Sequence, residues 1–306
     1  SMIQPRFIRV RSALVRECMA EFLGTFVLLL FGCSAAAQVK TSRETKGQFL
    51  SVNMAFSVGV MAAMYLTKGI SGAHLNPAVS LSFCVVGQVH WGRLLPYSLS
   101  QILGAYVASA LVYLVYYDAI MDFSGGVLTV YGPNETASIF ATYPTEFLSL
   151  SRSFLDQVVG TAMLLLCILC LGISMSMSGN CGAAINPARD LGPRLFSLTA
   201  GWGTELLQLW FWVPLVAPLI GGVVGTLTYL VFIEWQLPDL PHSNAPHTVG
   251  SCSTCERKEE LKEAQTVETN FLNNKVVYVH ILEYGRGQNG IRQYSIRNTK
   301  SRLLLL

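Results

Sequence analysis

Two copies of one short motif hold the residues best suited to contact a small polar molecule. Residues 72–78 read Gly-Ala-His-Leu-Asn-Pro-Ala, and residues 182–188 read Gly-Ala-Ala-Ile-Asn-Pro-Ala. Asn is a preferred helix N-cap and Pro suits the first helical position, so each motif predicts the start of a helix. The apolar stretch after each motif is too short to cross a bilayer, and such helix starts are tolerated at membrane depth only where they line a cavity. Two that meet would bring two amides and two positive dipole ends to one point of a pore.

The composition places these motifs in a membrane protein. The chain is 52% apolar or aromatic and only 13% charged, against roughly 25% charged in an average soluble domain. The net charge of +3 is too weak to indicate a nucleic-acid partner. No nucleophile–base set, phosphate loop or metal cluster accompanies the apolar segments, so we expect neither an enzyme nor a cofactor or metal. Four arginines before the first apolar run favour a cytoplasmic N-terminus; they are Arg6, Arg9, Arg11 and Arg16.

Five apolar segments are long enough to be predicted as membrane spans. They are residues 18–37, 49–70, 94–117, 154–177 and 206–233. The polar connection after the third span contains Asn134 in a glycosylation sequon, and three spans from an inside N-terminus place this Asn outside, where it is predicted to be glycosylated. The chain thus divides into a cytoplasmic segment 1–17, a channel domain 18–235 and a polar tail 236–306, which we expect to be poorly ordered.

The chain also contains an internal repeat. The sequence Glu-x-x-Gly-Thr that begins at Glu21 in the first span matches Gln-x-x-Gly-Thr, which begins at Gln157 in the fourth. With three spans in each half, such a repeat is inverted across the membrane, so the two short helices enter from opposite faces. A second match pairs Pro96 and Gly104 with Pro214 and Gly222.

These features resemble the aquaporin (major intrinsic protein) family from residue 11 to 235. Asn186-Pro-Ala-Arg-Asp, with Arg189 followed by Asp190, is similar to the aquaglyceroporin branch, which passes glycerol as well as water. The segments 71–79, 139–144 and 190–196 resemble the same branch. The resemblance implies an all-α membrane protein, an aquaporin-like bundle with an inverted repeat and two re-entrant half-helices. It also implies a homotetramer, or a hetero-tetramer with related subunits, in the plasma membrane.

The resemblance further implies which residues line the pore. Arg189 and Phe56 would form an outer constriction, with the guanidinium facing solute hydroxyls and the ring facing the carbon edge of glycerol. A charge in the apolar zone is costly unless it faces a polar cavity. The small residue Ala183 would leave this filter wide. The pore centre would be formed by Asn76, Pro77, Ala78, Asn186, Pro187 and Ala188.

Other polar residues near the motifs are expected to support the pore. Glu21 and Gln157 lie inside spans and should hydrogen-bond to the re-entrant loop backbones, which would otherwise be unsatisfied. His74 either titrates and gates the inner mouth or braces its loop by hydrogen bonds. Asp190 suits the positive end of a helix and is not expected to be a solute ligand. Cys181 is expected on the loop near the mouth, within reach of a mercurial.

The second half of the chain is shorter than the first. From Glu21 to Asn76 there are 55 positions, and from Gln157 to Asn186 there are 29, which is 26 fewer. Residues 154–177, about 36 Å as a helix, cross a core of ~30 Å once and not twice. The fifth span and its preceding loop are therefore expected to be largely absent. Counted strictly, the second half-helix would begin on the wrong side and the tail would emerge outside, although the basic tail favours the cytoplasm.

Two functions are consistent with these observations. The first is a passive channel for glycerol, water and other small neutral solutes across a lipid bilayer, with no energy coupling. The second is a truncated, non-conducting aquaglyceroporin subunit that modulates the assembly or trafficking of full-length relatives and is retained in the endoplasmic reticulum if misassembled. The shortened second half is the feature that favours the second function.

Overall fold

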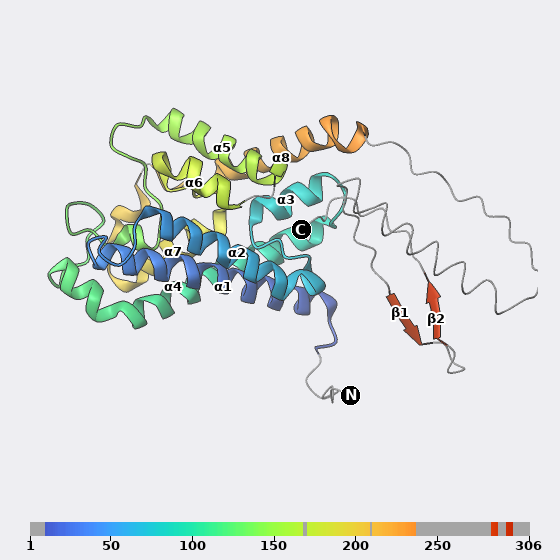
Figure 1. Ribbon diagram of the computed structural model, residues 1–306, viewed down its shortest axis with the longest axis horizontal. Helices are drawn as coiled ribbons and strands as arrows, with labels where there is room; N and C mark the ends of the chain where they lie inside the picture. Colours follow the sequence, from blue (N-terminus) through green and yellow to red (C-terminus); the bar gives the residue numbers. More distant parts are fainter. Residues whose placement is uncertain (1–9, 168–169, 209, 237–282, 287–291, 296–306) are drawn as a thin grey trace, which may run out of the picture. The chain divides into compact units, whose positions relative to one another are not determined.

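The computed structural model describes residues 10–167, 170–208, 210–236, 283–286 and 292–295 (Figure 1). The chain splits into one compact unit up to Trp235 and another from Gln236. The helices of the first unit are α1 (Ala13–Thr41), α2 (Phe49–Ser71), α3 (Pro77–Val85), α4 (Leu94–Ser124), α5 (Leu150–Cys167), α6 (Cys170–Cys181), α7 (Pro187–Ala200) and α8 (Val213–Phe232). Short 3-10 turns are η1 (Trp91–Arg93), η2 (Ala137–Ile139), η3 (Thr204–Leu207) and η4 (Glu234–Gln236).

The tail beyond η4 contributes one short hairpin. Strands β1 (Glu283–Arg286) and β2 (Arg292–Ser295) pair antiparallel, with Glu283 opposite Ser295. The rest of the predicted tail, and residues 1–9 of the predicted N-terminal segment, lie outside the described residues.

Four helical segments are long and apolar enough to cross a membrane, by length and composition within the described residues. They are Ala13–Thr41, Phe49–Ser71, Trp91–Ser124 and Val213–Gln236. They correspond to four of the five predicted spans and support an integral membrane protein. The last segment begins later than the predicted residue 206, because η3 precedes it. Pro214, at the start of α8, suits the first helical turn, where backbone N–H groups have no partner within the helix.

Close contacts at glycine bring equivalent helices together in the two halves. A Cβ built on Gly104 in α4 would lie 2.3 Å from the carbonyl oxygen of Phe22 in α1, and one built on Gly221 in α8 would lie 2.2 Å from that of Val158 in α5. The two carbonyls occupy matching positions of the repeat, one residue after its polar residue. The contacts therefore support the repeat but correct its register, because Gly104 corresponds to Gly221 and not to Gly222.

The predicted single span over residues 154–177 is wrong. The helix ends at Cys167, a second helix begins at Cys170, and α5 and α6 pack against each other as a hairpin (Figure 1). The Ser178 hydroxyl, near the end of α6, donates a hydrogen bond of 3.0 Å to the side chain of Asn53, near the start of α2. The chain thus turns back, and each helix satisfies most of its own backbone groups, as a membrane interior requires.

The α5–α6 hairpin is shorter than the corresponding helices in the first half of the chain. Beyond Glu21, α1 continues for 20 positions to Thr41, whereas α5 continues for 10 positions beyond Gln157 to Cys167. The difference is about 15 Å of helix. Because the hairpin returns to the end of the bundle where it starts, the second half-helix need not begin on the wrong side, and the side of the tail stays a prediction. The start of α1 and the end of α8 lie at the same end of the bundle (Figure 1).

Candidate pore and its constriction

Each half-helix begins with an asparagine cap, as the sequence predicts. The side-chain oxygen of Asn76 accepts from the backbone N–H of Ala78 at 2.8 Å, and that of Asn186 accepts from Ala188 at 3.0 Å. A proline follows each cap and opens the helix. Both asparagines adopt extended backbone conformations, which is the geometry of an N-cap.

The two caps also hold each other across the bundle. The amide nitrogen of Asn76 donates to the carbonyl oxygen of Ile185 at 3.0 Å, and that of Asn186 donates to the carbonyl oxygen of Leu75 at 2.8 Å. An amide nitrogen has two hydrogens. Within the described residues, one N–H of each amide therefore lacks a protein acceptor. Each half-helix thus brings an amide with a spare N–H up to the loop of the other half.

The loop before each cap has an unusual backbone. Ala73 and Leu75 have φ values of 55° and 57°, and Ala183 and Ile185 have φ values of 44° and 38°. Non-glycine residues rarely adopt this left-handed region, at a cost of roughly 1–3 kcal/mol each, and they keep it only where their surroundings enforce it. The strained residues occupy the same two positions before each Asn, so the two loops are structurally equivalent.

Buried polar side chains enforce this loop geometry. The Glu21 carboxylate is fully buried and accepts from the backbone N–H groups of His74 at 2.9 Å and Leu75 at 2.7 Å. The side-chain oxygen of Gln157 accepts from the backbone N–H of Ile185 at 2.9 Å. The repeat therefore supplies one side chain in each half to satisfy a backbone that would otherwise lack partners.

The structure brings two residues of the predicted constriction together. The guanidinium carbon of Arg189 lies 4.7 Å from the ring centroid of Phe56, an attractive cation–π arrangement. One terminal nitrogen of Arg189 donates to the carbonyl oxygen of Phe140 at 3.1 Å. Since a guanidinium carries five N–H groups, this contact fixes its position while its other N–H groups meet no acceptor among the described residues. Ala183 is buried on the second re-entrant loop, three residues before Asn186.

Asp190 is part of a buried clamp that sequence reasoning missed. Asp190 is fully buried and accepts from Nε of Arg194 at 2.9 Å and from the backbone N–H of Thr142 at 2.8 Å. Arg194 is 1% exposed and also donates to the carbonyl oxygens of Thr142 and Leu206. The pair thus ties α7 to the connection before α5 and to η3. The i, i+4 spacing of an acid and an arginine on a helix was the available signal.

His74 is held tightly in the first loop. The side chain is 5% exposed, and Nδ1 lies 2.9 Å from the hydroxyl of Ser80. The ring meets Phe83 and Tyr97 edge to face, with centroids 5.0 and 5.1 Å apart. These contacts favour bracing of the loop over a residue that stands free at the inner mouth.

The sequence predicts that Asn134 is accessible for glycosylation and that Cys181 is accessible to a mercurial, but only Asn134 is exposed. Asn134 is exposed in the connection between α4 and α5, while Thr136 of its sequon is buried and accepts from Nε1 of Trp202 at 3.0 Å. Cys181 is the last residue of α6 and is fully buried, because it packs in a cluster with Trp210. Its predicted place on a loop at the mouth is wrong.

The fold and the site together define a class of protein. Apolar helices surround two half-helices that enter from opposite ends and start at asparagine caps, and each cap amide donates to a carbonyl of the opposite loop. This is the architecture of a membrane channel for small polar solutes.

Comparison with known proteins agrees with this class. The major intrinsic protein family matches residues 9–178 and 171–229, and the two matches overlap within α6, where the second half is short. Human aquaporin-10 is 48% identical in an alignment of 259 residues that covers 76% of this chain and 86% of that protein. Human aquaporin-9 is 40% identical in an alignment of 283 residues that covers 84% of this chain and 94% of that protein. The solved aquaglyceroporin of Plasmodium falciparum has a TM-score of 0.64 at 30% identity, covering 71% of this chain and 95% of its own. The chain therefore belongs to the major intrinsic protein family.

Proposed function

We propose that this protein is a passive channel for glycerol, water and other small neutral solutes in the plasma membrane. Its relatives are aquaporins, and the solved neighbour is an aquaglyceroporin. The observation that carries the proposal is the pair of crossed asparagine caps, each with one N–H that meets no acceptor in the described part of the chain, in the same bundle as the contact between Arg189 and Phe56.

The geometry suits passage without tight binding. At the centre, a solute oxygen exchanges its water contacts for the N–H groups of Asn76 and Asn186, which replace hydration without trapping the molecule. The positive ends of the two half-helices converge there and oppose cations and protons. At the constriction, the remaining N–H groups of Arg189 would donate to hydroxyl oxygens while the Phe56 ring meets the carbon edge of glycerol.

The width of the filter can be tested at its smallest residue. In proteoliposomes, the protein should raise both glycerol uptake and osmotic water flux without an ion gradient. Ala183→Trp should abolish both fluxes because the indole would fill the space that the methyl group leaves. Gly179→Trp is the matched control, because Gly179 is exposed and a Cβ there meets no heavy atom within 4 Å.

The same assay separates the channel from the predicted alternative, a non-conducting subunit. Equal shrinkage rates of vesicles with and without verified inserted protein would reject the channel and favour that alternative. If both Trp variants lose glycerol and water flux equally, Ala183 does not line the filter. The flux of the unsubstituted protein would then need another explanation.

We further propose assembly as a homotetramer or with related subunits, as the family resemblance implies. Exposed apolar side chains along α2 and α4 supply surface for contact with lipid or neighbours. The mass of the detergent-solubilised complex tests this assembly, and a purely monomeric species would contradict it.

A further inference from the structure

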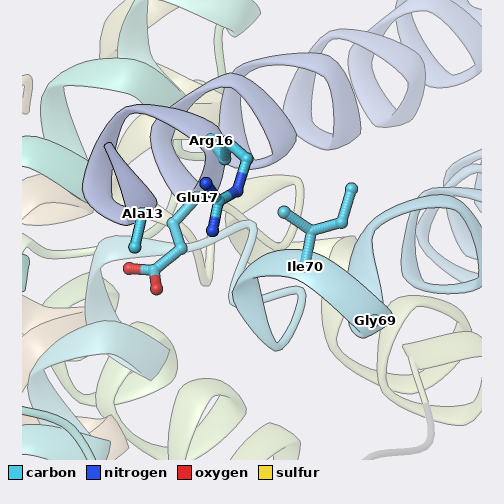
Figure 2. Close-up of a pocket in the computed structure, with 5 residues that line it drawn as sticks. All are labelled: Ala13, Arg16, Glu17, Gly69 and Ile70. Atoms are coloured by element: carbon cyan, nitrogen blue, oxygen red, sulfur yellow. The ribbon is translucent and has the colours of Figure 1, made fainter. Parts of the chain in front are cut away.

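A cavity of about 340 Å³ lies between the start of α1 and the end of α2 (Figure 2). Ala13, Arg16 and Glu17 line it from α1, and Gly69 and Ile70 line it from α2. The basic residues before the first span place this end of the bundle on the cytoplasmic side. Because α1 enters the apolar zone within its next turns, the cavity lies at the depth of lipid headgroups.

The charge of the cavity is set by Arg16. One terminal nitrogen of its guanidinium donates to the carbonyl oxygens of Val10 at 2.9 Å and Arg11 at 3.1 Å, which are neutral acceptors. The nearby Glu17 carboxylate pairs instead with Arg93 at 2.6 Å. With Glu17 compensated, Arg16 remains a positive charge held in place, and within the described residues its other N–H groups have no protein acceptor.

An apolar strip leads from this charge toward the middle of the bilayer. Ile70 is 56% exposed, and Leu66, one helical turn deeper on α2, is 57% exposed. Residues four apart lie on one face of a helix. A fixed cation at headgroup depth, continued by an apolar strip, matches a ligand with a phosphate at one end and a hydrocarbon chain at the other.

We propose that this cavity binds one anionic phospholipid of the inner leaflet. Arg16 donates hydrogen bonds to the lipid phosphate, and an acyl chain lies along Ile70 and Leu66. A free phosphate would use the charge but not the strip, so the ligand that fits is the lipid. The site is independent of solute conduction.

Native mass spectrometry of the full chain in detergent, titrated with phosphatidylserine, tests the site. Arg16→Gln should weaken the first lipid bound by about tenfold, as expected when charge-assisted hydrogen bonds to a phosphate are lost. Arg152→Gln is the matched control, since Arg152 is an exposed arginine in the first turn of α5, outside the cavity. It should bind the lipid as the wild type does.

A second variant fills the cavity while keeping the charge. A Cβ built on Gly69 meets no heavy atom within 4 Å, so Gly69→Leu should fold and occupy the space. It should weaken the first lipid as Arg16→Gln does, and excess inorganic phosphate should not displace that lipid. Unchanged binding in either cavity variant, an equal loss in Arg152→Gln, or displacement by inorganic phosphate would each overturn the site.

Discussion

Asn76 and Asn186 each perform three tasks with one small amide. The oxygen caps a half-helix, one N–H binds the opposite loop, and in the proposed pore the other N–H donates to a solute. Aspartate would keep the cap but lose both N–H groups, and alanine would lose all three interactions. The choice of residue therefore follows from the fold as much as from the solute.

The Asp190–Arg194 clamp should be a major contribution to stability. Removing one partner of a buried ion pair leaves the other charge uncompensated, typically at a cost of ~3–5 kcal/mol. We predict that Asp190→Asn markedly lowers the unfolding temperature in detergent, whereas Asp122→Asn, on the exposed end of α4, leaves it unchanged. Equal unfolding temperatures of Asp190→Asn and the wild type would contradict the clamp.

His74 offers a test of pH dependence at the first loop. The Ser80 hydroxyl lies 2.9 Å from Nδ1 of His74 and accepts from Nε2 of Gln101 at 3.3 Å, and we assign Nδ1 as the acceptor of the Ser80 hydrogen in the neutral ring. Protonation turns Nδ1 into a donor and forces this bond to rearrange. We predict that glycerol flux changes only at acidic pH, below about 6.5, where a histidine gains its second ring proton.

The matched variant is His74→Asn, whose carbonyl oxygen accepts from Ser80 at neutral and at acidic pH. It should fold, conduct and lose the pH response. If glycerol flux through the wild type does not change with pH, His74 only braces its loop. If His74→Asn retains the pH response of the flux, the titrating group lies elsewhere.

The half-helix starts could be predicted from the sequence because they depend on local rules. Three local signals indicate the structure around them: an Asn at the N-cap, a Pro at the first helical position and a polar residue inside an apolar span. The bonds from Arg194 to Thr142 and Leu206 could not be predicted, because they depend on loops that only the tertiary fold brings to α7.

At the scale of elements, the hairpin of α5 and α6 marks where the sequence prediction failed. An apolar run of the right length for one span says nothing about a turn inside it, and the run from 154 to 177 contains no proline at the break. The constraint is not local. The second loop must reach Leu75 and Gln157 to satisfy its backbone and its cap, and a chain that turns back allows this.

The α5–α8 contact should depend on glycine. A Cβ on Gly221 or Gly225 would lie 2.2 or 2.1 Å from backbone carbonyl oxygens of α5, which cannot move aside as a flexible side chain can. We predict that Gly221→Ala and Gly225→Ala each destabilise the protein by ~1–3 kcal/mol, as overpacking does.

Gly179→Ala is the control for these variants. Its Cβ meets no heavy atom within 4 Å, so better helix propensity should leave stability unchanged or raise it by up to ~1 kcal/mol. Thermal unfolding in detergent measures all three variants. Similar unfolding temperatures for the three would show that α5 and α8 are not packed this closely.

In the whole molecule, the turn between α5 and α6 allows the shortened second half to form its part of the proposed pore. If α5 and α6 together leave and return on the outer side, both half-helices keep their opposite directions, and α8 carries the tail back to the side of the N-terminus. The two overlapping family matches meet in this same region. The sidedness of the chain before and after the hairpin therefore distinguishes this pore from a chain that crosses once in this region.

The most direct test reads glycosylation of Asn134 together with the side of an epitope tag placed at residue 252, in intact and permeabilised cells. We predict a size shift that is lost in Asn134→Gln, and a tag that antibody reaches only after permeabilisation, because the basic residues of the tail favour the cytoplasmic side. A glycosylated Asn134 with a tag accessible on intact cells would mean that residues 154–177 cross once. The hairpin, and with it the pore described here, would then be contradicted.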